Sequence, residues 1–217
     1  MKAEYVDHMG DDISVVNAAR VSMDNSSDFD EQGILNCSDE KLIKYLSSHN
    51  HWTPFAHTAI TLRMSAPIPI RTQCFKHKVG FSENEESRRY ISSIPDVFVP
   101  DNFRMASDSV KQGSGGVHDK SDYWIDLYKS STTIAIHNYN AMISDGVCPE
   151  QARLVLPQGC EVNWIWTGNL ASYARFYNQR TDPNSQKEVA TLAKCVSDII
   201  SPLFNVSWSA MTNRVCS

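Results

Sequence analysis

Apolar residues recur along the chain at two distinct periods, and each period predicts its own kind of secondary structure. Ile60, Leu62 and Met64 alternate with more polar neighbours. This alternation predicts a strand over residues 58–65 with one buried face. Two shorter strands are expected at 5–9 and 89–94.

Spacings of three and four residues, which are typical of helices, dominate the rest of the chain. The longest helix is expected at about 123–144, with an apolar face made of Ile125, Tyr128, Thr132, Ala135, Tyr139 and Met142. Shorter helices are expected at 13–21, 39–48, 149–155 and 168–180, and a last long helix is expected to begin at Asp182-Pro183. Ser38 and Thr167 are the expected N-caps of the helices at 39–48 and 168–180.

These elements define the fold class as α+β. We expect a helix-rich single domain over residues 1–217 with a small, mostly antiparallel sheet. Residues 101–122 are rich in Ser, Gly and Asp and are expected to form a mobile loop. This segment is not a domain linker, because neither flank could be a complete domain.

Composition narrows the class of protein. A formal net charge of −5 argues against general nucleic-acid binding, which requires a basic excess. No apolar run approaches the roughly 18 residues that a membrane span requires, and the N-terminus lacks the apolar core of a signal peptide. Six scattered cysteines without a C-x-x-C pair favour reduced thiols over a disulfide frame or a zinc knuckle. We therefore expect a cytoplasmic protein.

The stretch 73–90 carries the densest charge in the chain. Its cations are Lys76, His77, Lys78, Arg88 and Arg89, and its carboxylates are Glu83, Glu85 and Glu86. Hydrogen-bonding residues, Gln73 and Ser87 among them, lie between these charges. Such a stretch suits a pocket for a polyanionic ligand, because Arg and Lys bind phosphate well. The same residues could also form an ordinary charged surface turn.

Two further segments combine polar and apolar residues at helical spacing. Asn169, Tyr173, Phe176 and Arg180 fall on one stripe of the expected helix at 168–180. That stripe could be a core face with polar ends, or it could lie along an extended ligand. Arg153 stands in an otherwise apolar short helix, where it could simply neutralise the carbonyl end of the helix dipole.

The spacing within 73–90 resembles the signature of the flavin-dependent thymidylate synthases. That signature is Arg-His-Arg, seven or eight residues, Ser, and a closing Arg-Tyr. Here Lys76-His77-Lys78 is followed by eight residues, Ser87 and then Arg89-Tyr90. Both family arginines of the first triplet are lysines in this chain. This change keeps the charge but removes the planar two-pronged donor.

Other landmarks resemble the same family in the same order, so that the resemblance runs from about residue 9 to 188. They are Ala18-Ala19-Arg20-Val21-Ser22, His51-x-Thr53-Pro54-Phe55-x-His57, Pro149 to Pro157, Thr167-Gly168-Asn169, and Gln179 to Pro183. There are also departures at Ala56, where many members have Glu, and at Ala171 and Arg175, where others often have Arg and Asn or His. Arg175 is expected to replace a lost flavin contact.

The resemblance implies conversion of dUMP to dTMP with FAD as cofactor and with NADPH and methylene-tetrahydrofolate as co-substrates. It also implies a homotetramer whose active sites are shared between subunits. Carried over by motif position, the dUMP ligands would be Gln73, Lys76, Glu85, Glu86, Ser87, Arg88, Arg89, Arg153 and Arg180. The FAD ligands would be Thr53, Lys76, His77, Lys78, Glu85, Asn169 and Arg175. Arg180 would be the catalytic residue and would polarise the uracil ring.

Two alternatives remain open at this point. His49, His51, His57 and His77 could form a metal site, although their spacing matches no zinc motif. The protein could also bind flavin and nucleotide without turnover, because the two lysines could preserve binding while abolishing the chemistry. Ser87, Cys74 and Cys160 are not expected to be nucleophiles, since Ser87 lacks a nearby activating base and the two cysteines suit a packed core.

Overall fold

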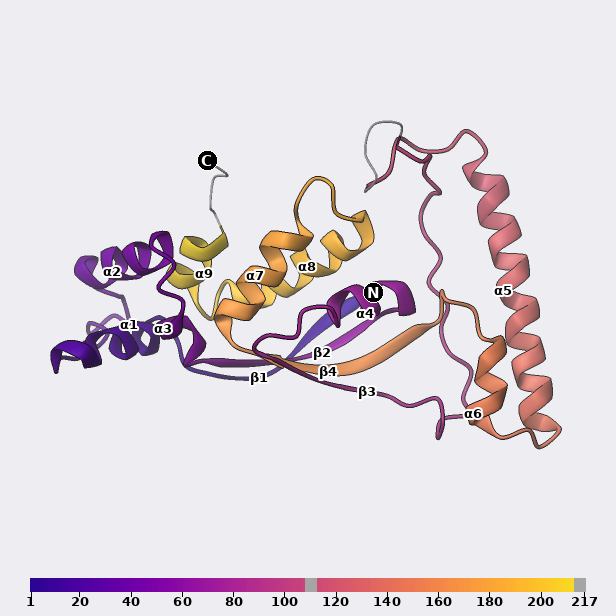
Figure 1. The fold of residues 1–217 in the computed structure, drawn as a ribbon, viewed down its shortest axis with the longest axis horizontal. Coiled ribbons are helices and arrows are strands. Elements are labelled where there is room, and N and C mark those ends of the chain that lie inside the picture. Colours follow the sequence, from indigo (N-terminus) through magenta and orange to yellow (C-terminus); the bar gives the residue numbers. More distant parts are fainter. Residues whose placement is uncertain (108–112, 213–217) are drawn as a thin grey trace.

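The computed structural model describes residues 1–107 and 113–212, and it confirms a helix-rich α+β architecture. A four-stranded antiparallel sheet crosses the middle of the molecule (Figure 1). In spatial order its strands are β1 (Lys2–Met9), β2 (Ala59–Pro67), β4 (Glu161–Gly168) and β3 (Phe81–Glu85).

The two central strands, β2 and β4, place their apolar residues on the same face of the sheet. Leu62 of β2 is paired with Trp166 of β4, and both side chains are fully buried. Burial alternates along β4 as it does in β2, so β4 is a half-buried strand. The sequence analysis did not predict β4, although Trp164, Ile165 and Trp166 have high strand propensity.

The predicted strand at 89–94 was wrong. The chain pairs with β4 earlier, where Phe81 lies opposite Gly168 and Glu85 lies opposite Trp164. After β3 the backbone turns, and the amide of Tyr90 donates to the carbonyl of Ser87 at 3.0 Å. The polar alternation of β3 fits an edge strand better than a buried one.

Helices lie on one face and at one end of the sheet (Figure 1). They are α1 (Asp12–Arg20), the 3-10 turn η1 (Val21–Met23), α2 (Cys37–Ser48), α3 (Thr53–Ala56), α4 (Ile68–Cys74), α7 (Leu170–Arg180), α8 (Lys187–Ile200) and α9 (Asn205–Thr212). In α8 the predicted apolar residues Val189, Leu192 and Val196 are fully buried, whereas Ile199 is only partly buried. The helix α9 was not predicted.

Three predicted helix starts were wrong, each by a few residues. Asn36 caps α2 in place of Ser38, because its side chain accepts from the amides of Ser38 and Asp39. Asn169 caps α7 in place of Thr167, which lies in β4. The helix α8 begins after Gln186 and not at Asp182-Pro183, since those two residues belong to a preceding turn.

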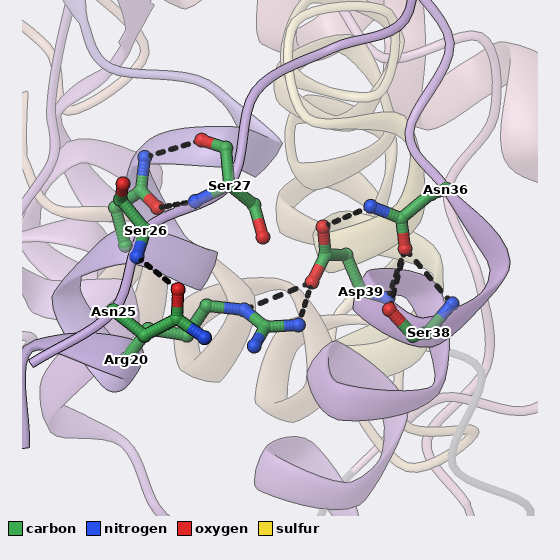
Figure 2. A network of polar contacts seen from close by, with 8 residues as sticks. Arg20, Asn25, Ser26, Ser27, Asn36, Ser38 and Asp39 are labelled. Carbon is green, nitrogen blue, oxygen red and sulfur yellow. Dashed lines mark hydrogen bonds and ion pairs between the residues drawn. The ribbon is translucent and has the colours of Figure 1, made fainter. Parts of the chain in front are cut away.

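A buried ion pair joins α1 to α2 (Figure 2). Arg20, from one of the family-like segments, donates through Nε to Asp39 Oδ1 at 3.0 Å and also through Nη2. Asn36 Nδ2 donates to the other carboxylate oxygen at 2.6 Å. Burial alone raises the pKa of Asp39, but hydrogen bonds from Arg20, Ser27 and Asn36 outweigh it and hold the pKa below its ordinary value.

The helices α5 (Ser121–Ser144) and α6 (Pro149–Ala152) and the turn η2 (Arg153–Val155) stand apart from the sheet, and we call residues 121–155 the arm (Figure 1). The predicted face of α5 packs inward, because Thr132 and Tyr139 are buried and Ile125, Tyr128, Ala135 and Met142 are partly buried. A second stripe, Tyr123, Leu127 and Ile134, is exposed at 59%, 45% and 59%. The stripe steps by four and seven residues, so it runs along one side of α5.

The chain on either side of residues 108–112 follows an extended path, and those five residues lie outside the described part. Arg104 pairs with Val117 in an isolated bridge, and its guanidinium donates to both carboxylate oxygens of Glu188 at 2.8 and 2.9 Å. Residues 121 and 122, predicted as loop, are the first residues of α5. Mobility of this segment stays a prediction. Among the described residues, no helix combines the length and apolar character needed to cross a bilayer.

Candidate active site

Arg180, the last residue of α7, donates to three acceptors on Gln73, near the end of α4, and on His77, shortly after it. Its Nε donates to His77 Nε2 at 2.9 Å, and its Nη2 donates to the backbone carbonyl of Gln73 at 3.0 Å. The Nη1 atom lies 3.4 Å from Gln73 Oε1. Gln73 is itself oriented by Gln186, whose Oε1 accepts from its Nε2 at 2.5 Å. The structure thus brings Arg180 together with Gln73 and His77, which precede it by more than 100 residues in sequence.

His77 is buried and its ring meets Phe176 edge-on, with ring centroids 5.1 Å apart. Burial and, secondarily, the positive charges of Arg180 and Arg175 lower the pKa of His77 to about 4. The imidazole is therefore neutral near pH 7. Because Nε2 accepts from Arg180, the ring proton is assigned to Nδ1.

The predicted stripe on α7, Asn169, Tyr173, Phe176 and Arg180, has a buried aromatic middle and two polar ends. Tyr173 and Phe176 are fully buried, and Tyr173 donates to the carbonyl of Trp166 at 2.8 Å. The aromatic middle is therefore core, and only the ends of the stripe reach the site. At the first end Asn169 caps α7, and at the last end Arg180 meets His77.

A hollow of about 480 Å³ opens beside the N-terminal half of α7. Its lining includes Trp52, Val79, Gly80, Asn169 and Arg175. Trp52 is 61% exposed, so a wide aromatic surface borders the hollow. Arg175 is exposed and donates to the carbonyl of Val79 at 2.6 Å. The hollow offers an aromatic face, a cation and the positive end of a helix dipole.

Gly80 makes the close approach between the signature stretch and α7 possible. Its φ is +77°, and a Cβ there would lie 2.1 Å from Ser172 Oγ. Ser172 Oγ donates to the carbonyl of Val79 at 2.9 Å, which fixes this backbone against the first turn of α7. A side chain at position 80 would push the two segments apart and open one wall of the hollow.

Three other predicted flavin ligands lie at the surface near this hollow. Thr53 lines the neighbouring cavity, which shares Asn50 and Trp52 with the hollow. Lys78 forms an ion pair with Glu83 and lies over the Phe75 ring, 5.4 Å from its centroid. Lys76 is exposed, and its side chain has no hydrogen-bond or ion-pair partner within the described residues. Both lysines therefore present their charge to solvent.

The predicted carboxylates at the end of β3 are tied to neighbouring elements. Glu85 pairs with Arg71 of α4 at 2.9 Å, and burial nevertheless raises the pKa of Glu85 above its ordinary value. Glu86 accepts from Asn163 of β4 at 2.9 Å and lies 3.8 Å from Arg88. Neither Arg71 nor Asn163 was singled out in the sequence, because nothing in their local pattern reveals these partners.

The turn after β3 approaches the arm. Ser87 Oγ accepts from the amide of Arg89 at 3.3 Å, and Arg88 donates to the carbonyl of Ser93. Arg89 reaches Glu150 of α6 at 3.4 Å. Arg153 is exposed, and its Nε donates to the backbone carbonyl of the same Glu150 at 3.2 Å. Ser87, Arg88, Arg89 and Arg153 therefore form a group at the base of the arm.

This group and the hollow beside α7 lie at opposite ends of β4 within one chain. Arg153 precedes β4, and Asn169 follows it. An eight-residue strand spans roughly 24 Å, so the two ends are too far apart for one small ligand. The single chain gathers its predicted site residues into separate groups and does not unite Arg153 with Asn169.

The described residues contain no group of three or more His, Cys, Asp or Glu that could hold a metal ion. His49, His51 and His57 are exposed, while His77 is bound to Arg180. The metal alternative therefore has no structural support in that part of the chain. Cys74 and Cys160 are buried free thiols, and burial raises their pKa to about 12 and about 11, so both are neutral packing residues.

Trp52, Val79 and Ser172, which line the hollow, and Gln186, which contacts Gln73, were not predicted from the sequence. Trp52 had a signal, because it stands inside a segment already singled out for its histidines. Gln186 had none, since its bond to Gln73 spans 113 residues. An arginine with exposed donor groups beside a hollow at a helix N-terminus is typical of sites that bind phosphorylated ligands.

Comparison with known proteins agrees with that class. The model of the family described as Thymidylate synthase complementing protein matches residues 4–204. The flavin-dependent thymidylate synthase of Thermosipho africanus is 36% identical over 196 residues, covering 89% of this chain and 83% of that protein. The one from Kosmotoga olearia is 32% identical over 210 residues, covering 96% and 88%. The chain therefore belongs to this family of flavin-dependent thymidylate synthases.

A solved structure shows the same architecture. The UMP/dUMP methylase PolB from Streptomyces cacaoi, bound with 5-Br dUMP, superposes with a TM-score of 0.85 at 29% identity. The match covers 97% of this chain and 94% of that chain. Family membership and this likeness define the chain as a flavin-dependent methyltransferase by class.

Proposed function

We propose that this protein converts dUMP to dTMP, with FAD as cofactor, NADPH as reductant and methylene-tetrahydrofolate as carbon donor. The observation that carries the proposal is the placement of Arg180, held beside the signature stretch by Gln73 and His77. A structural neighbour bound with 5-Br dUMP and relatives named as flavin-dependent thymidylate synthases support it.

The proposed dUMP ligands divide by the chemistry of the nucleotide. The phosphate suits the cations at the base of the arm, Arg88, Arg89 and Arg153, together with Lys76 and the Ser87 hydroxyl. The sugar and base suit hydrogen-bonding groups, which are Gln73, Glu85 and Glu86. Arg180 would contact a carbonyl of the uracil ring.

The hollow beside α7 fits part of an FAD molecule. Its donors are those that a dinucleotide requires, because the start of α7 and Arg175 suit the pyrophosphate and Trp52 suits an aromatic ring. Asn169, Thr53, His77, Lys76, Lys78 and Glu85 would complete the cofactor site. Bound FAD, reduced by NADPH, would supply the hydride.

Arg180 would act on charge that develops in the uracil ring. A guanidinium hydrogen-bonded to a ring carbonyl stabilises negative charge on that oxygen and so activates the ring toward the carbon donor. Its acceptors orient three of its donor groups, and the remaining N–H bonds are available to a ligand. Preorganisation of this kind lowers the barrier without a rearrangement at the moment of reaction.

The assembly would be a homotetramer in which each active site takes residues from several chains. The separation of Arg153 from Asn169 supports this proposal, since one chain leaves the two groups at opposite ends of β4. The exposed stripe Tyr123, Leu127 and Ile134 supports it too, because an apolar helix face of this kind is usually covered by a partner. Joining two copies can place the arm of one beside the hollow of another.

The proposal is tested by NADPH-driven dTMP formation in the FAD-loaded protein, with the visible flavin spectrum followed before and after NADPH and dUMP. We expect bleaching of the flavin bands and production of dTMP. A protein that retains FAD and dUMP but forms no dTMP would instead be a binding protein. Lys76 and Lys78 would then be the first residues to test as the cause of the lost turnover.

Sharing of sites is tested by mixing two inactive variants. Arg153→Ala and Arg180→Ala damage different groups, so shared sites in mixed tetramers would include some with both arginines intact. We expect turnover to reappear after the variants are dissociated and reassembled together. Each variant reassembled alone is the control, and a mixture as inactive as the controls would contradict shared sites.

A further inference from the structure

The arginines that the structure describes include some that pair with carboxylates, Arg71, Arg88 and Arg89 among them, and some that contact only neutral acceptors. Arg20 and Arg104 join elements of the fold and pair with carboxylates, Asp39 and Glu188 respectively. Arg153, Arg175 and Arg180 contact only neutral acceptors within the described residues. Those acceptors are two backbone carbonyls, from Glu150 and Val79, and the Gln73 and His77 groups around Arg180.

Arg180 shows the pattern most clearly, because it has more partners than the other two. A carboxylate would hold a guanidinium more firmly than these acceptors do, since ion-paired hydrogen bonds are roughly twice as strong as neutral ones. A carboxylate would also cancel most of the arginine's field at short range. Neutral acceptors orient the guanidinium and leave its positive charge available to a ligand.

His77 is the acceptor whose neutrality matters most. It is 6% exposed, packs edge-on against Phe176 and has Arg180 and Arg175 as positively charged neighbours. These surroundings disfavour the imidazolium, so Nε2 keeps a lone pair for Arg180. Gln73 contributes an amide oxygen and a carbonyl, neither of which titrates.

We propose that His77 and Gln73 are positioning residues that form a neutral cradle for Arg180, and that the missing counter-charge is itself required for turnover. This inference rests on the proposed function, because the beneficiary of the free charge is the anionic uracil ring in the transition state. In this proposal His77 orients Arg180, in addition to its predicted contact with FAD.

A matched pair of substitutions separates charge from geometry. His77→Gln and His77→Glu both place an oxygen near the position of Nε2, have nearly the same size and lose the same ring contact with Phe176. They differ only in charge. We expect FAD-loaded His77→Gln to turn over more slowly than the parent, because it loses the proposed FAD contact, but faster than His77→Glu, because its amide oxygen still accepts from Arg180. We expect His77→Glu to lower kcat by about 100-fold, the usual effect of losing one charge-stabilising contact.

The melting temperature separates this role from a purely structural one. If His77 were only structural, a variant with a lower kcat would also have a lower melting temperature. His77→Glu should melt no lower than His77→Gln, because its ion pair with Arg180 offsets the cost of desolvating the buried carboxylate. Higher stability with lower kcat identifies the cradle as electrostatic. FAD content and the KM for dUMP are measured in each variant, so that loss of cofactor or of substrate binding is separated from loss of turnover.

Equal kcat values for the two FAD-loaded variants, with the parent active, would overturn this inference and leave the proposed function standing. Equal losses in both variants would also overturn it, since the imidazole itself would then be required. Should His77→Glu fail to fold, Gln73→Glu brings a carboxylate against the same guanidinium, and an active Gln73→Glu would overturn the cradle. A parent that forms no dTMP would contradict the proposed function first.

Discussion

The arm and the rest of the chain, which we call the body, differ in how far they complete their own structure. In the body, α7 and α8 bury Phe176 and Leu192 in the core, and α9 buries Trp208 beside α2 and α7. In the arm, α5 is roughly 36 Å long and buries only one of its two apolar faces. The body therefore has a core of its own, whereas the arm has an apolar face that no described residue covers.

The same difference separates the two halves of the proposed site. Arg180 is fixed by contacts within the body, and its geometry is already present in a single chain. Arg153 lies in the arm, and among the described residues its guanidinium hydrogen-bonds only to Glu150, so its donors remain open to the proposed ligand. Under the proposed function, the body would orient the reacting residues, and their assembly into a complete site would depend on the arm.

The largest expected effect comes from the exposed face of the arm. Leu127→Glu combined with Ile134→Glu puts two charges into the proposed contact, and burying unpaired charges there is too costly for association. We expect loss of the tetramer, measured by light scattering, and with it loss of turnover. Thr133→Glu adds a charge to another side of the same helix and should remain assembled. A tetrameric, active double variant would contradict the role of this face.

The next largest effect concerns the body's contribution to chemistry. Arg180→Ala removes one charge-stabilising contact, which typically costs about 3–4 kcal/mol of barrier. Turnover should fall by about two to three decades while FAD stays bound, because the hollow is lined by other residues. If the variant is slightly destabilised but keeps near-parental turnover, Arg180 is not catalytic and only stabilises the C-terminal end of α7.

A stability effect within the body comes third. Asp39→Asn removes the carboxylate that Arg20 and Asn36 contact, and we expect a loss of about 2–3 kcal/mol in the free energy of unfolding at pH 7. Glu40→Gln is the matched control, since Glu40 forms only an exposed pair with Lys44 at 3.3 Å. A loss no greater than that of the control would show that the Arg20–Asp39 pair is dispensable.

The pH dependence of this effect has a definite sign. The folded pKa of Asp39 lies below its ordinary value of 3.8, so its contribution is fully present above that value. The contribution is lost as the pH falls through the lower folded pKa. The difference in melting temperature between Asp39→Asn and the parent should therefore shrink below about pH 4.

The smallest expected effect lies in the signature itself. Replacing Lys76 and Lys78 by Arg keeps both charges and adds directional donors, so FAD affinity should stay equal or improve by less than about 1.5 kcal/mol. Titration of the apoprotein with FAD measures it, with the parent beside it. A large loss of affinity would mean that the site is adapted to lysine.

The sequence by itself determined the features that depend on short-range pattern. The apolar faces of α5 and α8 and the buried face of β2 follow from residue spacing, and they were predicted. The candidate site residues were also named from local motifs, and Gln73, His77 and Arg180 do meet. Local spacing suffices for these because a helix or strand positions neighbours at fixed intervals.

Only the tertiary structure decided the features that depend on distant partners. β3, and not residues 89–94, forms the edge of the sheet, because residues 81–85 pair with residues 164–168 of β4. The caps moved to Asn36 and Asn169, where backbone geometry allowed their side chains to accept. The neutral surroundings of Arg180 arise where the ends of α4 and α7 meet, and no local pattern encodes a hydrogen bond across 103 residues.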